Sequence, residues 1–398
     1  MTAAARPPLN RSLAEFGTTI FAEMSQLAAE TGAINLGQGF PDTDGPAAVL
    51  EAARRAIAEG RGNQYPPGPG IPELRRAISG HRARTYGLAY DPDREVLVTA
   101  GATEAIAAAM FGLLEPGDEV IALEPYYDSY AACIAMAGAR RVPVTLRPHG
   151  DRFVLDLDEL RAAVTGRTRL ILLNTPHNPT GAVLPREQLA AIAELCVEQD
   201  LYAVTDEVYE HLVFDGGTHV PLATFPGMRE RTVSISSAGK TFSVTGWKVG
   251  WVCASPELTL AVRTAKQFLT YVSSGPFQYA VAEALALPPE YFAGFTADLQ
   301  AKRDLLSAAL ADAGFGVMRS EGTYFVTADI RPLGLDGPAG ADGEGFCRML
   351  PHRAGVVAIP SQVFYDHREQ GAPYVRFAFC KRPEVLTEAA ARLKTLAR

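Results

Sequence analysis

The chain contains 398 residues, of which 47% are hydrophobic and 21% are charged, and this ordinary globular composition excludes a disordered chain. Its 37 basic and 45 acidic residues give a formal net charge of −8, which argues against a dedicated nucleic-acid partner or a basic membrane-binding surface. A chain of this length is expected to form two or three domains, or one large α/β body with a smaller companion.

Cysteine usage and the N-terminal residues point to a reducing compartment. The five cysteines lie far apart and form no Cys-x-x-Cys pair, so neither a disulfide framework nor a metal site is expected. Residues 1–17 carry two adjacent prolines and charged residues where a signal peptide needs an apolar core. No uncharged apolar stretch of about 18 residues occurs in the sequence. We therefore expect a soluble, cytoplasmic protein without a membrane partner.

The first 95 residues combine helical segments with loops rich in glycine and proline. Apolar spacing predicts a helix over 13–31, which Gly32 would end, and a second helix over 46–59. The segment NLGQGFPDTDGP between them predicts a loop.

From about residue 95, short β-rich runs alternate with helical segments. Strands of four to six apolar residues separated by helices of 10–15 residues are typical of βαβ units with a largely parallel sheet. The sequence therefore predicts an α/β fold. The expected strands are EVLVT, EVIALE, RVPVTL, RLILLN, YAVTD, TVSISS and KVGWVCA.

After residue 285 the pattern changes to α+β. A long helix is predicted over 290–313, followed by three strands (TYFVTADI, GVVAIP and YVRFAFC) and a final helix that begins at Pro383. We expect residues 1–45 to form an N-terminal arm that joins the smaller domain, 46–290 to form the large domain, and 291–398 to form the small C-terminal domain.

Chemically useful residues follow five of the predicted strands at their carboxyl ends, where open parallel sheets bind ligands. In chain order they are Ala102 and Thr103 at a helix start, Tyr127, Asn174 and Asn178, Asp206 and Tyr209, and Ser237 and Lys240. Each one alone has an ordinary explanation as a helix cap, a turn residue, a packed ring or a solvated lysine. Lys240 stands out because only six of the 37 basic residues are lysine.

Taken together, these residues meet the needs of pyridoxal 5′-phosphate. The aldehyde of this cofactor needs a lysine amine such as Lys240, because arginine does not deprotonate. Its ring nitrogen needs a carboxylate, for which Asp206 is suited. Its phosphate needs helix N-terminal amides, hydroxyls and cations, which Ala102, Thr103, Ser237 and Lys248 can supply.

The segment SSAGKTFSVTGWKVGW resembles the lysine motif of the class I/II aminotransferases, which are pyridoxal-phosphate enzymes of fold type I. NTPHNPTG, TDEVYEHL, GATEA and YVRFAFCK resemble further motifs of this family, in the family's order. Within the family, NLGQGFPD, NQYPPGPG and EPYYDSY are similar to the kynurenine/glutamine aminotransferase group and to N-succinyldiaminopimelate aminotransferase. The resemblance covers almost the whole chain. It implies a large cofactor-binding domain with a mainly parallel sheet between helices, and a homodimer with shared active sites.

The resemblance also implies roles for individual residues. Lys240 would hold the cofactor as a Schiff base and then move the substrate α-proton, while Asp206 would contact the ring nitrogen. Asn178 and Tyr209 would contact the ring oxygen, and Tyr127 would cover the ring. The phosphate would be bound by Ala102, Thr103, Ser237 and Lys248, with Tyr65 of a second subunit. Arg376 would bind the substrate carboxylate beside the Gly39 backbone, Asn174 and Asn178. Many relatives have arginine where Lys248 stands, but this subgroup uses lysine.

The alternation of the YVRFAFC strand predicts two different faces. Arg376 would share one face with Tyr374 and Ala378, opposite Val375 and Phe377. An arginine on a solvent face is the plain alternative to a carboxylate-binding one.

The expected reaction moves the amino group of an L-amino acid to a 2-oxo acid by a ping-pong route. Two alternatives are a cysteine-S-conjugate β-lyase on the same scaffold and a non-catalytic regulator, although no basic DNA-binding extension supports the latter. The side-chain pocket is expected to use Phe16, Phe21, Tyr65 and Phe364. Kynurenine, glutamine, methionine, aromatic amino acids and N-succinyldiaminopimelate all remain open as donors.

Overall fold

A seven-stranded sheet lies at the centre of the computed structural model, which describes residues 9–17 and 19–397. Its strand order is β2-β10-β9-β8-β7-β3-β4. These strands are β2 (Val96–Thr99), β3 (Glu119–Glu124), β4 (Arg140–Thr145), β7 (Thr168–Asn174), β8 (Tyr202–Asp206), β9 (Thr232–Ser237) and β10 (Gly250–Cys253). Only β10 runs antiparallel to its neighbours, so the predicted mainly parallel sheet of an α/β fold is confirmed.

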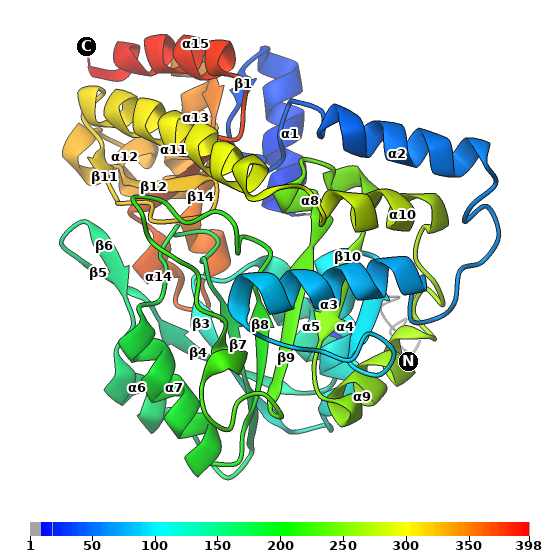
Figure 1. Cartoon of the computed structure of the whole chain (residues 1–398). Helices are drawn as coiled ribbons and strands as arrows, with labels where there is room; N and C mark the ends of the chain where they lie inside the picture. Colours follow the sequence, from blue (N-terminus) through cyan, green and yellow to red (C-terminus); the bar gives the residue numbers. More distant parts are fainter. Residues whose placement is uncertain (1–8, 18, 398) are drawn as a thin grey trace, which may run out of the picture.

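Helices cover both faces of this sheet (Figure 1). On one face lie α4 (Gly101–Leu113), α5 (Asp128–Met136) and α9 (Pro256–Lys266). On the other lie α2 (Ala47–Ala58), α3 (Pro72–Tyr86), α6 (Leu157–Ala162), α7 (Arg186–Glu198) and α10 (Gly275–Ala284). Along β3, Val120 and Ala122 therefore enter one core while Ile121 and Leu123 enter the other, which explains the unbroken apolar runs in the strands.

A second, antiparallel sheet has the strand order β11-β12-β15-β14. Its strands are β11 (Gly316–Val317), β12 (Phe325–Asp329), β14 (Ile359–Pro360) and β15 (Tyr374–Ala378). It packs in one core with α11 (Pro289–Asp312), α13 (Gly343–Ala354) and α15 (Pro383–Leu393). The short elements are β5 (Arg147–His149), β6 (Arg152–Val154), α8 (Ala238–Thr241), α12 (Pro338–Ala341) and α14 (Arg368–Gly371), with 3₁₀ turns at Arg11–Leu13, Leu222–Thr224, Thr245–Trp247, Arg331–Leu333, Ser361–Phe364 and Lys394–Ala397.

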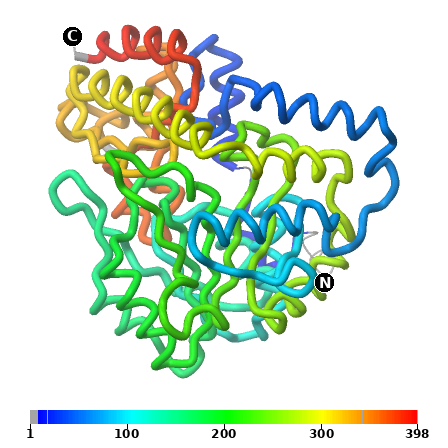
Figure 2. The backbone as a smooth tube through the Cα atoms, viewed as in Figure 1, coloured from blue at the N-terminus to red at the C-terminus, as the bar shows by residue number. Residues whose placement is uncertain are grey.

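The N-terminal elements lie beside the C-terminal ones. Strand β1 (Ile34–Asn35) pairs in parallel with β13 (Val356–Val357). Helix α1 (Ile20–Thr31) contacts α13, as Figure 2 shows where the blue and orange parts of the tube meet.

Some expected element boundaries are confirmed and others are wrong. The long helix predicted over 290–313 is α11, and Gly32 ends α1 at a φ of 64° as expected. The helix predicted over 13–31 begins only at Ile20, because the Thr19 side chain accepts a hydrogen bond from the Ala22 amide and caps the helix there.

Two further properties of the fold bear on the predictions. Every residue of β15 is buried, so the alternative in which Arg376 lies on a solvent face is wrong. The Ala378 amide donates to the Leu36 carbonyl at 2.6 Å, so the N-terminal segment packs beside this strand. In the part of the chain that the structure describes, no helix has the length and hydropathy needed to cross a membrane.

Candidate active site

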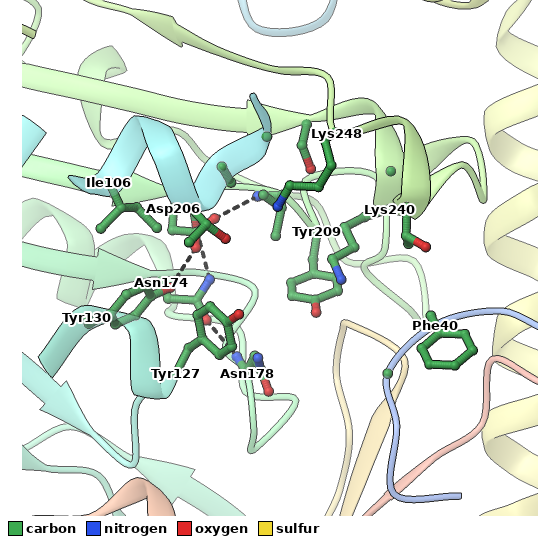
Figure 3. A pocket seen from close by; sticks show the side chains of 18 of the residues that line it. Phe40, Ile106, Tyr127, Tyr130, Asn174, Asn178, Asp206, Tyr209, Lys240 and Lys248 are labelled. Carbon is green, nitrogen blue, oxygen red and sulfur yellow. Dashed lines mark hydrogen bonds between the residues drawn. The ribbon is translucent and has the colours of Figure 1, made fainter. Parts of the chain in front are cut away.

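A cavity of about 340 Å³ lies where the carboxyl ends of the large sheet meet the smaller sheet. The loops after β7, β8 and β9 and the start of α4 form one side, and β15 and the loop after β1 form the other. Among its lining residues are Gly39, Ala102, Thr103, Tyr127, Asn174, Asn178, Asp206, Tyr209, Ser237, Lys240, Lys248 and Arg376. Figure 3 shows how the labelled side chains surround one space.

Lys240 enters the cavity from α8, the short helix that follows β9. Its Nζ donates a hydrogen bond to the Tyr324 hydroxyl at 2.8 Å. Burial lowers the pKa of Lys240 to about 8, with the nearby charges of Arg376 and Lys248 acting in the same direction. At pH 7 about one in ten such amines is neutral, so Lys240 can act as a nucleophile or a base.

Asp206 ends β8 with its carboxylate deep in the cavity, where the residue is 4% exposed. One oxygen accepts from the Tyr130 hydroxyl at 2.6 Å and the other from the Val208 amide at 3.3 Å. Burial raises the pKa of Asp206, while these two donors and the Lys240 charge oppose that rise. No described residue forms a salt bridge with this carboxylate. Since an unpaired buried charge is costly, the site is suited to a ligand with a positive group at this position.

Arg376 is the opposite case, a buried cation without a described carboxylate partner. It is 1% exposed, and its two terminal nitrogens donate to Asn178 Oδ1 and the Gly37 carbonyl, both at 2.9 Å. Its Nε has no hydrogen-bond partner, and burial lowers its pKa to about 10. The guanidinium carbon lies 4.0 Å from the centre of the Phe325 ring, which fixes its plane. The arrangement is suited to an incoming carboxylate.

The start of α4 offers an anion site at the other end of the cavity. The helix has no side-chain cap, so its first amides are free of intrahelical partners. Lys248 Nζ lies 3.2 Å from where a Cβ on Gly101 would sit, and a Cβ on Gly250 would lie 2.5 Å from the Gly101 carbonyl carbon. Only glycine at these two positions allows the helix start and the Lys248 loop to come so close. Thr103 and Ser237 add hydroxyls to the same lining.

Two asparagines tie the loop after β7 to its surroundings. Asn174 Nδ2 donates to the Asp206 carbonyl at 2.9 Å, and its Oδ1 accepts from the Asn178 amide at 2.7 Å. Asn174 therefore positions the loop rather than offering a free group. Arg376 donates a hydrogen bond to the side-chain oxygen of Asn178, Oδ1. The side-chain NH₂ of Asn178 therefore remains free to donate to a ligand.

These groups fit pyridoxal 5′-phosphate. An amine, an unpaired carboxylate, an uncapped helix start with a lysine, an amide donor and the aromatic ring of Tyr127 surround one cavity. Each would meet a different part of that molecule.

Of the other expected site residues, only Phe21 lines the cavity. Tyr65 is 80% exposed and does not line the cavity of its own chain, where it packs edge-on against Tyr271. Phe21 lines the cavity, and Phe364 packs near both Phe21 and Arg376. Phe16 packs against the core of α4 and α5 rather than lining the cavity.

Two tyrosines at the site were not predicted from the sequence. The Tyr324 hydroxyl accepts from Lys240 and donates to the Gly39 carbonyl at 2.5 Å, so it joins the lysine to the N-terminal loop. Tyr130 holds the Asp206 carboxylate. Both stand in apolar runs that are typical of a core, and Tyr324 lies within the predicted strand TYFVTADI, which gives no sign that its hydroxyl reaches Lys240.

Residues 31–393 match the family Aminotransferase class I and II. The chain is 56% identical over 393 residues to a probable N-succinyldiaminopimelate aminotransferase of Mycobacterium tuberculosis, covering 97% of this chain and 98% of the relative. It is 39% identical over 388 residues to methionine aminotransferase of Escherichia coli, covering 96% and 97%. The solved structure of N-succinyldiaminopimelate aminotransferase from Mycobacterium tuberculosis superposes with a TM-score of 0.94 at 56% identity, covering 98% of this chain and 100% of that one.

Proposed function

Because the chain belongs to the class I and II aminotransferases, pyridoxal-phosphate-dependent enzymes of fold type I, we propose that it moves the amino group between N-succinyldiaminopimelate and a 2-oxo acid. The activity class rests on the family. The choice of substrate is supported by identity along nearly the full length of a relative that bears that name. The observation that best supports the proposed active site is that Arg376, which is buried without a carboxylate partner, faces the cavity that also holds Lys240 with its lowered pKa.

We propose that Lys240 holds the cofactor covalently, takes the α-proton from the substrate and would deliver it to the carbon of the cofactor that receives the amino group. Bound pyridoxal 5′-phosphate supplies an aldehyde that receives the amino group and an electron-poor ring that accepts the electrons left behind. The depressed pKa of Lys240 lets its amine accept a proton near neutral pH. The hydrogen bond to Tyr324 keeps the amine inside the cavity.

The other residues of the cavity would bind and orient the cofactor and the substrate. Asp206 would keep a proton on the ring nitrogen, and Asn178 and Tyr209 would donate to the ring oxygen. The α4 amides, Thr103, Ser237 and Lys248 would hold the phosphate. Arg376 would hold the substrate carboxylate through its planar fork, and Tyr127 would cover the ring.

Replacing Arg376 with lysine is expected to raise KM for the amino donor and to lower kcat/KM about 10²-fold, or about 3 kcal/mol. Lysine keeps the charge but loses the two-pronged contact and the packing on Phe325. Steady-state kinetics checks this, with the exposed Arg382→Lys as the control. An unchanged KM for the donor would exclude this role.

A panel of amino donors with 2-oxoglutarate tests the proposed substrate. N-succinyldiaminopimelate is expected to give the highest kcat/KM, above methionine, kynurenine and glutamine. A higher value for any of these three would overturn the choice of substrate. Release of pyruvate and ammonia from a thioether amino acid without an added 2-oxo acid would instead indicate β-lyase activity.

We also propose a homodimer in which Tyr65 reaches the phosphate of the partner's site. The support is an exposed apolar patch, defined here as Tyr65, Phe268, Leu269 and Tyr271, which are 80%, 82%, 43% and 57% exposed. Phe268→Glu is expected to convert the dimer to a monomer in sedimentation, since it places a charge in an apolar interface. Val197→Glu, on α7 at another exposed apolar position, should leave the dimer intact. A dimer that survives Phe268→Glu would contradict this interface.

We further propose that residues 1–45 act with the small domain, 291–398, against the large cofactor-binding domain, 46–290. The pairing of β1 with β13 supports this division. A cytoplasmic location fits the five cysteines, all of which are buried and free.

A further inference from the structure

Three residues outside the cavity bring metal-binding atoms together. They are His81 on α3, and Glu210 and His211 in the turn that follows β8. One ligand atom from each lies within 4.8 Å of the other two. The Nε2 atoms of the two histidines face each other at 2.9 Å.

Hydrogen bonds and aromatic packing hold the side chains of this His-Glu-His cluster in place. Glu210 accepts from the Ser236 hydroxyl at 2.6 Å and from Arg82 at 3.1 Å. The two imidazole rings pack against Phe292, with centroid distances of 5.7 Å for His81 and 4.6 Å for His211. A carboxylate has about four lone-pair directions, so Glu210 keeps two for a further ligand.

The charges around the cluster favour a cation. Arg82 is the one described arginine or lysine that pairs with the two buried carboxylates Glu207 and Glu210. His219 approaches Glu207 from another side, at 3.3 Å.

The geometry suits an ion of the zinc type. Two imidazole nitrogens bound to Zn²⁺ at about 2.0–2.1 Å lie about 3.3 Å apart in a tetrahedral site, so the rings need to separate by only roughly 0.4 Å. His211 is only half-buried, so it can make this movement and leave the fourth position to water. Two imidazoles with one carboxylate form a ligand set typical of Zn²⁺ and Co²⁺.

We propose that His81, Glu210 and His211 form a binding site for a divalent transition-metal ion, separate from the cofactor cavity. The ion would tie α3 to the turn after β8. That turn also carries Tyr209, and β9 carries both Ser236 and Ser237, so the ion would brace one wall of the cavity from behind. It takes no part in the transfer of the amino group.

The test uses the holoenzyme, freed of bound metal with a chelator and then titrated with Co²⁺ and with Zn²⁺. Calorimetry is expected to show one bound ion per chain, and Co²⁺ should give the visible spectrum of a tetrahedral site. His211→Gln should weaken binding at least about 10²-fold, whereas His352→Gln, at an exposed histidine of α13, should bind as the wild type does.

A second measurement separates lost binding from lost folding. Zn²⁺ should raise the unfolding midpoint of the wild type and of His352→Gln but not that of His211→Gln, which should keep its cofactor colour. Wild-type protein that binds no Co²⁺ or Zn²⁺ would mean that the two histidines merely share a proton, and this would overturn the proposal. If His211→Gln bound the ion as tightly as the wild type does, the ion would lie at another place, such as the cofactor, and the proposal would be overturned as well.

Discussion

The Lys240→Ala variant is expected to lose at least about 10³-fold in turnover, since the change removes the amine that we propose both holds the cofactor and moves the α-proton. The fold should survive, because the side chain lies against a cavity and is not packed in a core. The proposed phosphate-binding residues are untouched, so the variant should still bind the cofactor, though without a covalent link. Single-turnover conversion of a bound amino donor measures the loss.

Two controls show whether Lys240 acts chemically. Lys394→Ala, which removes an exposed lysine, should retain wild-type turnover. Adding a small alkylamine to Lys240→Ala should restore part of the lost rate, because a free amine can enter the cavity and carry the proton. Turnover of Lys240→Ala near the wild-type value would refute the assignment.

Replacing Asp206 with asparagine is expected to lower kcat by about 10² to 10³-fold. The amide has the same shape and can still accept from Tyr130, but it cannot balance a positive ring nitrogen. The cofactor colour should persist, so single-turnover kinetics isolates the effect on proton removal. Asp158→Asn, at an exposed position of α6, is the matched control.

Stability offers an independent check on Asp206. In the folded protein the pKa of this carboxyl lies above its ordinary value of 3.8, so the free energy of unfolding falls as pH rises past that value. Replacing Asp206 with asparagine removes this loss of stability, because the amide does not ionise. At neutral pH, the cofactor-free variant should therefore be more stable than the cofactor-free wild type, and with cofactor bound the order should reverse. The same order in both states would mean that Asp206 does not face a positive group.

Much of the site could be predicted because it follows one rule of parallel sheets. Asp206 ends a strand, Asn178 and Lys240 lie a few residues beyond strand ends, and the carboxyl ends of those strands meet at one edge. Periodicity also located α11 within a residue at each end, because that helix is long and regular.

The features of the fold and of the site that were not predicted depend on contacts between distant segments of the chain. Tyr324 reaches Lys240 across 84 residues of chain, and His81 meets His211 across 130, so no local spacing reveals either pair. The full burial of β15 was not predicted, because the alternation of apolar and polar residues describes only the strand itself. It carries no information about the N-terminal segment that packs beside the strand. The late start of α1 arose from a competing cap at Thr19, which outweighed the apolar spacing before it.

The proposed function requires that Lys240, and no other lysine, holds the cofactor. Borohydride treatment of the holoenzyme makes that attachment permanent, and mass spectrometry of the digested chain then locates it. The added pyridoxyl mass is expected on the peptide that contains Lys240 and on no peptide with another of the six lysines. The same mass on Lys248 or any other lysine, or no added mass at all, would contradict it.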